Sequence, residues 1–278
     1  HLSIRRQRQM CIRDSLSAEK QYIDMLRSKG VDGIIFTSAH MGDPNIVELA
    51  GEEFPIILVN RRTYHPIVKE KIDYVGVDNI LCGFLAVEHL IKLGHKRIGM
   101  IGGSSESSVG FERAEGGRKA LYAYGLEEIK EYLLEGDFLK ESGYQGGRKF
   151  LRMAEPPTAI FAMNDYMAIG VYQAILEEGH RVPEDMAIIG FNDIEFTAMK
   201  GIELTTIGQK KFEMGAIAVK TLVEKIEGGE IKLSTREILL KPELIIRKTC
   251  GFHLTGYQIE SRIWDGVGHI KSEARNQE

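Results

Sequence analysis

The sequence predicts an α/β fold made of parallel β-sheets that are buried on both faces. Short runs of β-branched and other apolar residues alternate with longer segments in which apolar residues recur with a period near 3.6, as in β-α-β units. The 278 residues, 43% hydrophobic and 27% charged, suffice for one large or two ordinary domains with a full core. This composition excludes a disordered, collagen-like or coiled-coil chain.

The apolar runs predict seven strands, separated by helices. The strands are expected at 32–36, 55–60, 73–78, 97–103, 132–137, 158–164 and 186–192. A helix over 81–93 has one apolar side and stops at Gly94, a residue suited to a left-handed C-cap, and a second helix is expected over 210–227. Residues 236–248 form two strand-like runs parted by Pro242, which predicts a ribbon at a sheet edge.

Four of the predicted strands end directly in polar side chains. These are Asn60 after "IILV", Asp78 after "DYVGV", Asn164 and Asp165 after "AIFAM", and Asn192 after "AIIGF". In an open parallel sheet, ligands bind outside the carboxyl ends of the strands, where helix N-termini point their free N–H groups. Helix capping is an equal alternative at any single position, because Asn and Asp are favoured N-caps. Four such ends in one chain favour a shared ligand site.

The polar groups at these strand ends suit a sugar. Carboxylates and carboxamides each form two hydrogen bonds in one plane, which matches vicinal hydroxyls better than a phosphate or an apolar ligand. The turn "IGGSSESSVGFER" (101–113) has neither GxGxxG nor GxxxxGK[ST], so the nucleotide signal is weak. Without GxSxG, HExxH or a paired-carboxylate spacing, the residues predict no enzyme, no metal site and no cofactor.

Charge and cysteine content limit the partners. A net charge of -4 and a pI near 6.1 give no overall attraction to nucleic acid, so contact with DNA would need a local basic module. Cys11, Cys82 and Cys250 lack CxxC or Cys/His spacing, which argues against a disulfide framework and fits a reducing cytoplasm. No run of 18 apolar residues occurs, so no membrane span is expected.

The two ends of the chain differ from its middle. Residues 1–15 carry four arginines and no apolar period. They could form a basic arm for nucleic acid, but they also look like translated sequencing-adapter read-through, and we interpret them as foreign sequence that replaces a lost natural start. Residues 251–278 hold the only tryptophan, Trp264, and no sustained period, so we treat them as a tail of unknown role.

From about residue 16 to 250, the chain resembles the effector-binding core of the lactose-repressor family of bacterial transcription regulators. The matching segments include "DYVGVDN", "AVEHLIKLGHKRIGMIGG", "FERAEGGRKAL" and, most specifically, "PPTAIFAMNDYMAIGVYQAILEEGHRVPEDMAIIGFNDIE". The resemblance implies a type I periplasmic-binding-protein-like fold, in which two doubly wound parallel-sheet subdomains clasp a small ligand.

In such a fold the chain crosses between the subdomains three times. Here the crossings would lie near residues 92–96, 206–209 and 230–235. The N-terminal subdomain would then comprise 16–94 plus 209–231, and the C-terminal subdomain 95–208 plus 232–250.

The resemblance also implies roles for single residues. Arg113 falls where the family's motif has an arginine that bonds effector hydroxyls or a carboxylate; by itself it reads as a solvated helix charge. Asn164 falls at the family's effector asparagine, and Asp78 at a strand-end aspartate that faces the cleft. At Asn192 and Asn60 the family often has aspartate; the amide lacks the charge, which puts effector preference there in doubt. The expected effector-binding residues are Asp78, Arg113, Asn164, Asn192, Asn60 and Asp165.

Family members begin with a helix-turn-helix DNA-binding domain, a hinge helix and a strand, helix and strand that do not precede residue 16 here. The absent first strand would lie beside 32–36. We therefore expect an unpaired strand edge and an uncovered apolar face there, a weakened N-terminal subdomain and no specific DNA binding by this chain.

Three functions remain open. The leading one is a cytoplasmic, sugar-responsive transcription regulator, seen as its effector core and expected to form a homodimer, with DNA bound only through a missing N-terminal domain. A periplasmic sugar-binding protein of a transport system shares the fold and differs upstream. An enzyme on a Rossmann-like sheet is third, since no nucleophile, base or metal set supports it.

Overall fold

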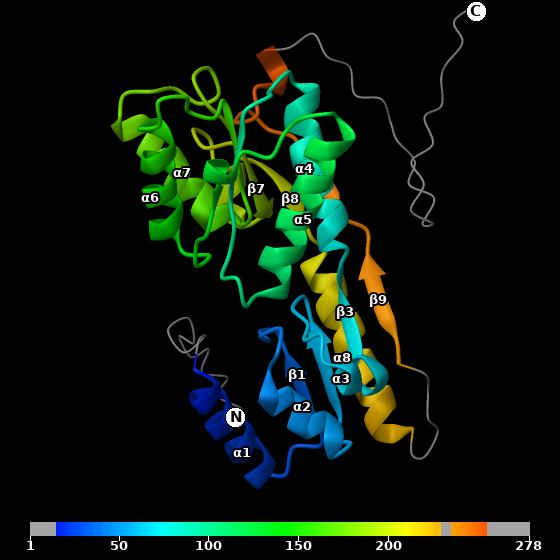
Figure 1. The fold of residues 1–278 in the computed structure, drawn as a ribbon. Coiled ribbons are helices and arrows are strands. Elements are labelled where there is room, and N and C mark those ends of the chain that lie inside the picture. The colour runs from blue at the N-terminus through cyan, green and yellow to red at the C-terminus, as the bar shows by residue number, and fades with distance from the viewer. Residues whose placement is uncertain (1–14, 229–234, 255–278) are drawn as a thin grey trace, which may run out of the picture.

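The computed structural model describes residues 15–228 and 235–254. They form two α/β lobes, one above the other in Figure 1, each built around one sheet. Almost all of the basic segment expected at 1–15, most of the tail expected at 251–278 and most of the crossing expected at 230–235 lie outside the described residues.

The first lobe, the lower one in Figure 1, contains a four-stranded parallel sheet. The strand order is β1 (Ile34–Phe36), β2 (Ile56–Val59), β3 (Asp73–Val77) and β9 (Glu237–Leu240). Its helices are α1 (Leu16–Ser28), α2 (Pro44–Gly51), α3 (Pro66–Lys71) and α8 (Lys211–Glu227). Of these, α8 packs against β1, β2 and β3.

The second lobe contains a six-stranded sheet, parallel except at one edge. The order is β10 (Glu243–Ile245), β8 (Thr205–Gly208), β7 (Ala187–Asn192), β6 (Ala159–Ala162), β4 (Ile98–Ile101) and β5 (Leu133–Leu134), with β10 antiparallel to β8. Its helices are α4 (Asn79–Lys92), α5 (Ser108–Ala123), α6 (Lys140–Leu151) and α7 (Asp165–Glu177). The short 3-10 turns are η1 (Lys130–Tyr132), η2 (Glu195–Ala198) and η3 (Phe252–Leu254).

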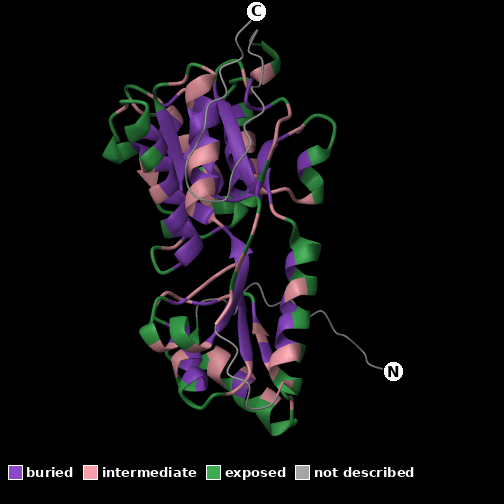
Figure 2. Ribbon diagram, turned by 90° about the vertical axis from the view of Figure 1, so that its right-hand side faces the viewer, coloured by how far each residue is buried: buried purple, intermediate pink, exposed green. Residues whose placement is uncertain are grey.

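The central strands are buried along their whole length, as Figure 2 shows for both lobes. Parallel strands covered by helices on both faces need apolar residues at every position, which explains the continuous apolar runs of the sequence. The largest fully buried apolar side chains are those of Phe150, Phe161 and Phe191, all in the second lobe.

Glycines let the helices of the second lobe pack backbone to backbone. A Cβ on Gly83 of α4 would lie 2.0 Å from the carbonyl oxygen of Arg113, and one on Gly116 of α5 would lie equally close to a carbonyl oxygen of α4. The α6–α7 pair is built the same way, through Gly143 and Gly170. The α4–α5 contact thereby fixes the backbone of Arg113, one of the expected effector-binding residues.

Residues 236–248 do not form the single edge ribbon that the sequence predicted. β9 pairs in parallel with β3 of the first sheet, whereas β10 pairs antiparallel with β8 of the second sheet. Lys241 and Pro242 therefore join the two lobes, and β9 belongs to the first lobe, not to the expected C-terminal subdomain. A proline break marks the end of a strand, but it does not determine which sheet the next strand joins.

The first crossing also differs from the prediction, which placed it at 92–96. Because α4 packs along α5 and against β6 and β8, the chain crosses directly after β3, at residues 77–79. The apolar side of a helix does not identify the sheet that receives it. Residues 205–208, where no strand was predicted, form the buried strand β8, and the chain crosses after it, at 209–210.

β1 is an edge of the first sheet among the described residues, in agreement with the expected open edge at 32–36. Among the described residues, the apolar side chains of β1 that were expected to be uncovered are buried. Ile34 and Phe36 are buried in one cluster with Ile23 of α1 and Leu49 of α2. The two N-terminal helices therefore contribute to the cover of this strand.

Glu19, in the first turn of α1, links the stability of the first lobe to pH. Burial raises the pKa of Glu19 from 4.5 to about 7, opposed by a 3.0 Å hydrogen bond from Asn45 Nδ2 and assisted by the charge of Asp43. The folded chain therefore holds a proton that the unfolded chain has lost between pH 4.5 and about 7. The free energy of unfolding should fall as the pH rises through this window.

We expect the free energy of unfolding, measured with urea, to fall by about 1–2 kcal/mol between about pH 5 and about pH 7.5. This fall is smaller than the full pKa shift of Glu19 implies, because Glu19 is partly exposed. Glu19→Gln should abolish this fall. Glu70→Gln, at an exposed position on α3, is the matched control and should retain it. An undiminished slope in Glu19→Gln would show that another group titrates.

Candidate functional site

Arg113 of α5 lies where three strands end. Its Nε donates to Asn79 Oδ1 (2.9 Å), just after β3, and its Nη1 donates to the carbonyl oxygen of Met163 (2.7 Å), just after β6. Its guanidinium carbon lies 3.4 Å from the ring centre of Phe191 in β7. Each of these three contacts is the chain neighbour of an expected effector-binding residue. Those residues are Asp78, Asn164 and Asn192.

The positive charge of Arg113 is buried, and no carboxylate among the described residues is hydrogen-bonded to it. The residue is 2% exposed, and burial lowers the pKa of Arg113 to about 10, so the guanidinium still carries its charge at neutral pH. Among the described residues, two of its five N–H donors have hydrogen-bond partners, and both acceptors are neutral oxygens. Such a group can bond further acceptors strongly.

Asp78 and Asn164 cap helices. Asp78 Oδ1 accepts from the backbone N–H of Leu81 (2.9 Å) at the start of α4. Asn164 Oδ1 accepts from the backbone N–H of Met167 (2.8 Å), and its Nδ2 donates to the carbonyl oxygen of Phe138 (2.7 Å). The capping alternative is therefore confirmed at both positions. Capping occupies only one carboxylate oxygen of Asp78. In Asn164, both the oxygen and the nitrogen of the amide are hydrogen-bonded within the protein.

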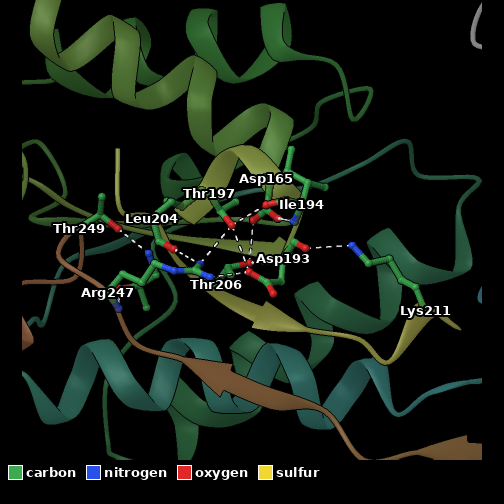
Figure 3. A network of polar contacts seen from close by, with 10 residues as sticks. Asp165, Asp193, Ile194, Thr197, Leu204, Thr206, Lys211, Arg247 and Thr249 are labelled. Atoms are coloured by element: carbon green, nitrogen blue, oxygen red, sulfur yellow. Dashed lines mark hydrogen bonds and ion pairs between the residues drawn. The ribbon is translucent and has the colours of Figure 1, made fainter. Parts of the chain in front are cut away.

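Asp165 holds the turn after β7 (Figure 3). Its side chain is fully buried: Oδ1 accepts from the hydroxyl of Thr206 (2.7 Å) and Oδ2 from the backbone N–H of Ile194 (2.9 Å). Burial raises the pKa of Asp165. Because both oxygens are engaged within the protein, the observed role of Asp165 is to position this turn, and its contact with an effector stays a prediction.

A second part of the same network joins the turn to Arg247, after β10, and to the start of α8, just after one crossing between the lobes. Asp193 Oδ1 accepts from Arg247 Nη2 (2.8 Å) and from Thr197 Oγ1 (3.1 Å), and Arg247 Nη1 also donates to the carbonyl oxygen of Leu204 (2.8 Å). Lys211 Nζ, at the start of α8, donates to the carbonyl oxygen of Asp193 (2.9 Å). Sequence reasoning missed Arg247, because in the sequence it is an ordinary charged residue that follows a strand.

Asn192 faces a crossing segment. Its Oδ1 accepts from Nε2 of Gln209, the residue that follows β8 on the way to the first lobe. The backbone of Asn192 has φ 115°, which lies in the left-handed region. Asparagine, like aspartate, enters positive φ more readily than most residues, which is a local reason for one of these two residue types here.

The loop after β2 and the start of α5 meet at the junction of the lobes, where the backbone N–H of Arg62 donates to Ser108 Oγ (3.0 Å). Each segment carries a buried oxygen without a hydrogen-bond partner among the described residues, Asn60 Oδ1 and Ser107 Oγ. A buried polar atom left unbonded costs about 1–3 kcal/mol. Both oxygens can therefore accept a further hydrogen bond.

Glu112, beside Arg113 on α5, is a second residue that sequence reasoning missed. It is 7% exposed and contacts Tyr64 Oη (2.7 Å), Asn79 Nδ2 (2.9 Å) and Arg62 Nε (3.3 Å). Its sequence signal is weak, because a glutamate on a helix usually faces solvent.

Aromatic rings cover the three arginines of the junction. The guanidinium of Arg61 lies 5.1 Å from the ring centre of Phe138, and that of Arg62 lies 4.0 Å from the ring centre of Tyr74. With Arg113 over Phe191, each cation rests on an apolar surface that holds its orientation.

Among residues 15–228 and 235–254, no group of three or more His, Cys, Asp or Glu side chains is arranged to hold a metal ion. In the same part of the chain, no helix has both the length and the apolar character needed to cross a bilayer.

Known proteins match most of the chain. Residues 87–250 match the family of periplasmic binding protein-like domains. The HTH-type transcriptional repressor PurR of Actinobacillus pleuropneumoniae serotype 3 (strain JL03) is 33% identical over 230 residues, which are 83% of this chain and 67% of that protein. The chain thus spans about two thirds of the length of this relative.

Solved structures agree in fold. The putative transcriptional regulator LacI from Bacillus cereus subsp. cytotoxis NVH 391-98 has a TM-score of 0.77 at 33% identity and aligns with 82% of this chain and 79% of its own. A complex of the transcriptional regulator CelR with cellobiose has a TM-score of 0.77 at 31% identity, over 83% of this chain and 69% of its own.

Proposed function

Because the chain belongs to the LacI family of bacterial transcription regulators, we propose that it is the effector-binding core of such a regulator and binds a sugar at the junction of its two lobes. In the intact protein, a bound sugar would shift the lobes against each other and change the spacing of DNA-binding domains. The DNA contact would come from a helix-turn-helix domain, in a homodimer that acts in the cytoplasm.

The observation that carries this proposal is the presence of unsatisfied polar groups on segments that meet at the junction of the two lobes. The guanidinium has donors to spare, while Asn60 Oδ1 and Ser107 Oγ are buried acceptors without a partner among the described residues. A sugar hydroxyl both donates and accepts, so one ligand could serve both kinds of group. The cellobiose held by the related CelR supports the choice of a sugar.

The other two functions have less support. The relative and both solved structures described above are transcription regulators by name, which favours regulation over transport. The same names include no enzyme, and the described residues bonded to Arg113 and its neighbours form helix caps and buried hydrogen bonds.

A ligand screen by thermal unfolding tests the proposal. Pentoses, hexoses, disaccharides and purines would each be added to the chain. A sugar present at about 100 times its Kd should stabilise the folded state by about 2.7 kcal/mol and raise the Tm. If no sugar raises the Tm, or if only a purine does, the sugar assignment is wrong.

A further inference from the structure

Glu112 lies at the point where the two lobes touch. It belongs to α5 of the second lobe, but two of its partners, Tyr64 and Arg62, come from the loop after β2 in the first lobe. Both partners are anchored in that lobe. The backbone N–H of Tyr64 donates to the carbonyl oxygen of Met41 (2.9 Å), and Arg62 Nη1 donates to Glu237 Oε1 (2.6 Å) on β9. One buried carboxylate therefore bonds the second lobe to two fixed points of the first.

The other oxygen of the same carboxylate orients the contact of Arg113. Glu112 Oε2 accepts from Asn79 Nδ2 (2.9 Å), and Asn79 Oδ1 accepts from Arg113 Nε (2.9 Å). An amide has donors at one end and an acceptor at the other, so a carboxylate and a guanidinium on opposite ends permit only one orientation. Glu112 thus holds the Nδ2 end of Asn79, which also donates to the carbonyl oxygen of Val77 (3.4 Å), while the Oδ1 end faces Arg113.

We propose that Glu112 is a positioning residue that couples the guanidinium of Arg113 to the contact between the two lobes. When the lobes separate, Glu112 loses Tyr64 and Arg62, and its hold on Asn79 and thereby on Arg113 is weakened. The inference rests on the proposed function only where it assigns an effector to Arg113. The lobe contact itself needs no ligand and can be tested without one.

Glu112→Gln is the sharpest variant because it changes one atom and the charge but not the shape. A glutamine has one acceptor in place of two, so its NH2 group would face either the Asn79 amide donor or the Tyr64 hydroxyl. The ion pair with Arg62 Nε is lost in either case. Removing one hydrogen bond to a charged group changes an equilibrium constant by about tenfold or more.

Hydrogen–deuterium exchange of the full chain without effector tests the contact between the lobes through which Glu112 would act. Two backbone N–H groups report on lobe contact: that of Met41, which donates to the carbonyl oxygen of Glu106 (3.0 Å), and that of Arg62, which donates to Ser108 Oγ (3.0 Å). In Glu112→Gln, peptides that contain these groups should exchange about tenfold faster, while peptides from β6 keep their rates. Glu115→Gln on the same helix, where Glu115 pairs with Arg118 three residues on (3.7 Å), is the matched control and should match the wild type.

Unchanged exchange at Met41 and Arg62 in Glu112→Gln would overturn the inference. If all peptides exchange faster, the variant is globally destabilised, and Tyr64→Phe then decides, because it removes only the hydroxyl that donates to Glu112. Selective acceleration at the junction in Tyr64→Phe supports the coupling, and wild-type rates overturn it. None of these results depends on a sugar, so failure of the sugar screen and failure of this inference are separate outcomes.

Discussion

Arg113→Met is expected to weaken effector binding by about 100-fold or more, since it removes at least two charge-assisted hydrogen bonds of about 1.5–3 kcal/mol each. The substituted side chain is long and apolar, so it can fill much of the same space against the ring of Phe191. Removing a buried charge also removes the cost of its desolvation. The loss should therefore fall on affinity more than on stability.

Stability should change by about 2 kcal/mol or less in Arg113→Met, because Asn79 Oδ1 and the carbonyl oxygen of Met163 lose their donor while the desolvation cost disappears. Titration calorimetry with the best sugar from the screen gives Kd, and urea unfolding gives the stability. Arg118→Met, on the same helix with surface ion pairs to Glu115 and Glu128, is the matched control and should keep the wild-type Kd. If the Kd of Arg113→Met stays within about threefold of the wild-type Kd, the loss of binding free energy is well under 1 kcal/mol. That result would exclude Arg113 from the effector site.

Gly83→Ala is expected to lower the free energy of unfolding by about 3 kcal/mol or more, at the upper end of the usual cost of overpacking. The added Cβ would lie 2.0 Å from the carbonyl oxygen of Arg113 and 3.0 Å from its Cα. These are backbone atoms, which cannot rotate away as a flexible side chain can. The helices α4 and α5 would have to separate, and Arg113 would move with α5.

Urea unfolding measures this effect, and α8 provides the matched control. Gly215 lies inside α8 with no atom within 4 Å of an added Cβ. Gly215→Ala should raise stability by about 0.5–1 kcal/mol, because alanine restricts the unfolded chain and favours a helix. If Gly83→Ala were as stable as the wild type, the close α4–α5 contact would be wrong.

Much of the fold could be predicted from the sequence because each strand needs its own local pattern. The run at 55–60 is apolar at nearly every position, and the run at 73–78 has Tyr74, Val75 and Val77 between two aspartates; they form β2 and β3 close to the expected bounds. The sheet that a helix or strand joins cannot be predicted from its own local pattern. α4 has one apolar side wherever it packs, and the break at Pro242 looks the same in a hairpin as in a crossing between lobes.

The candidate site could be predicted only in part, for a similar reason. Asn and Asp at strand ends are visible in the sequence, and Asp78 and Asn164 do lie beside contacts of Arg113. Whether such a side chain caps a helix or is free for a ligand depends on backbone direction after the strand, which the sequence does not specify. Burial of Arg113 and Glu112 depends on α4 and the loop after β2, segments distant in the chain.

A crystal structure of the chain with the best sugar bound tests the central claim most directly. We expect sugar hydroxyls within hydrogen-bonding distance of the Arg113 guanidinium, with Asn60 Oδ1 or Ser107 Oγ accepting from the same ligand. A sugar bound on an outer face of either lobe, with Arg113 still bonded only to Asn79 and Met163, would contradict the account.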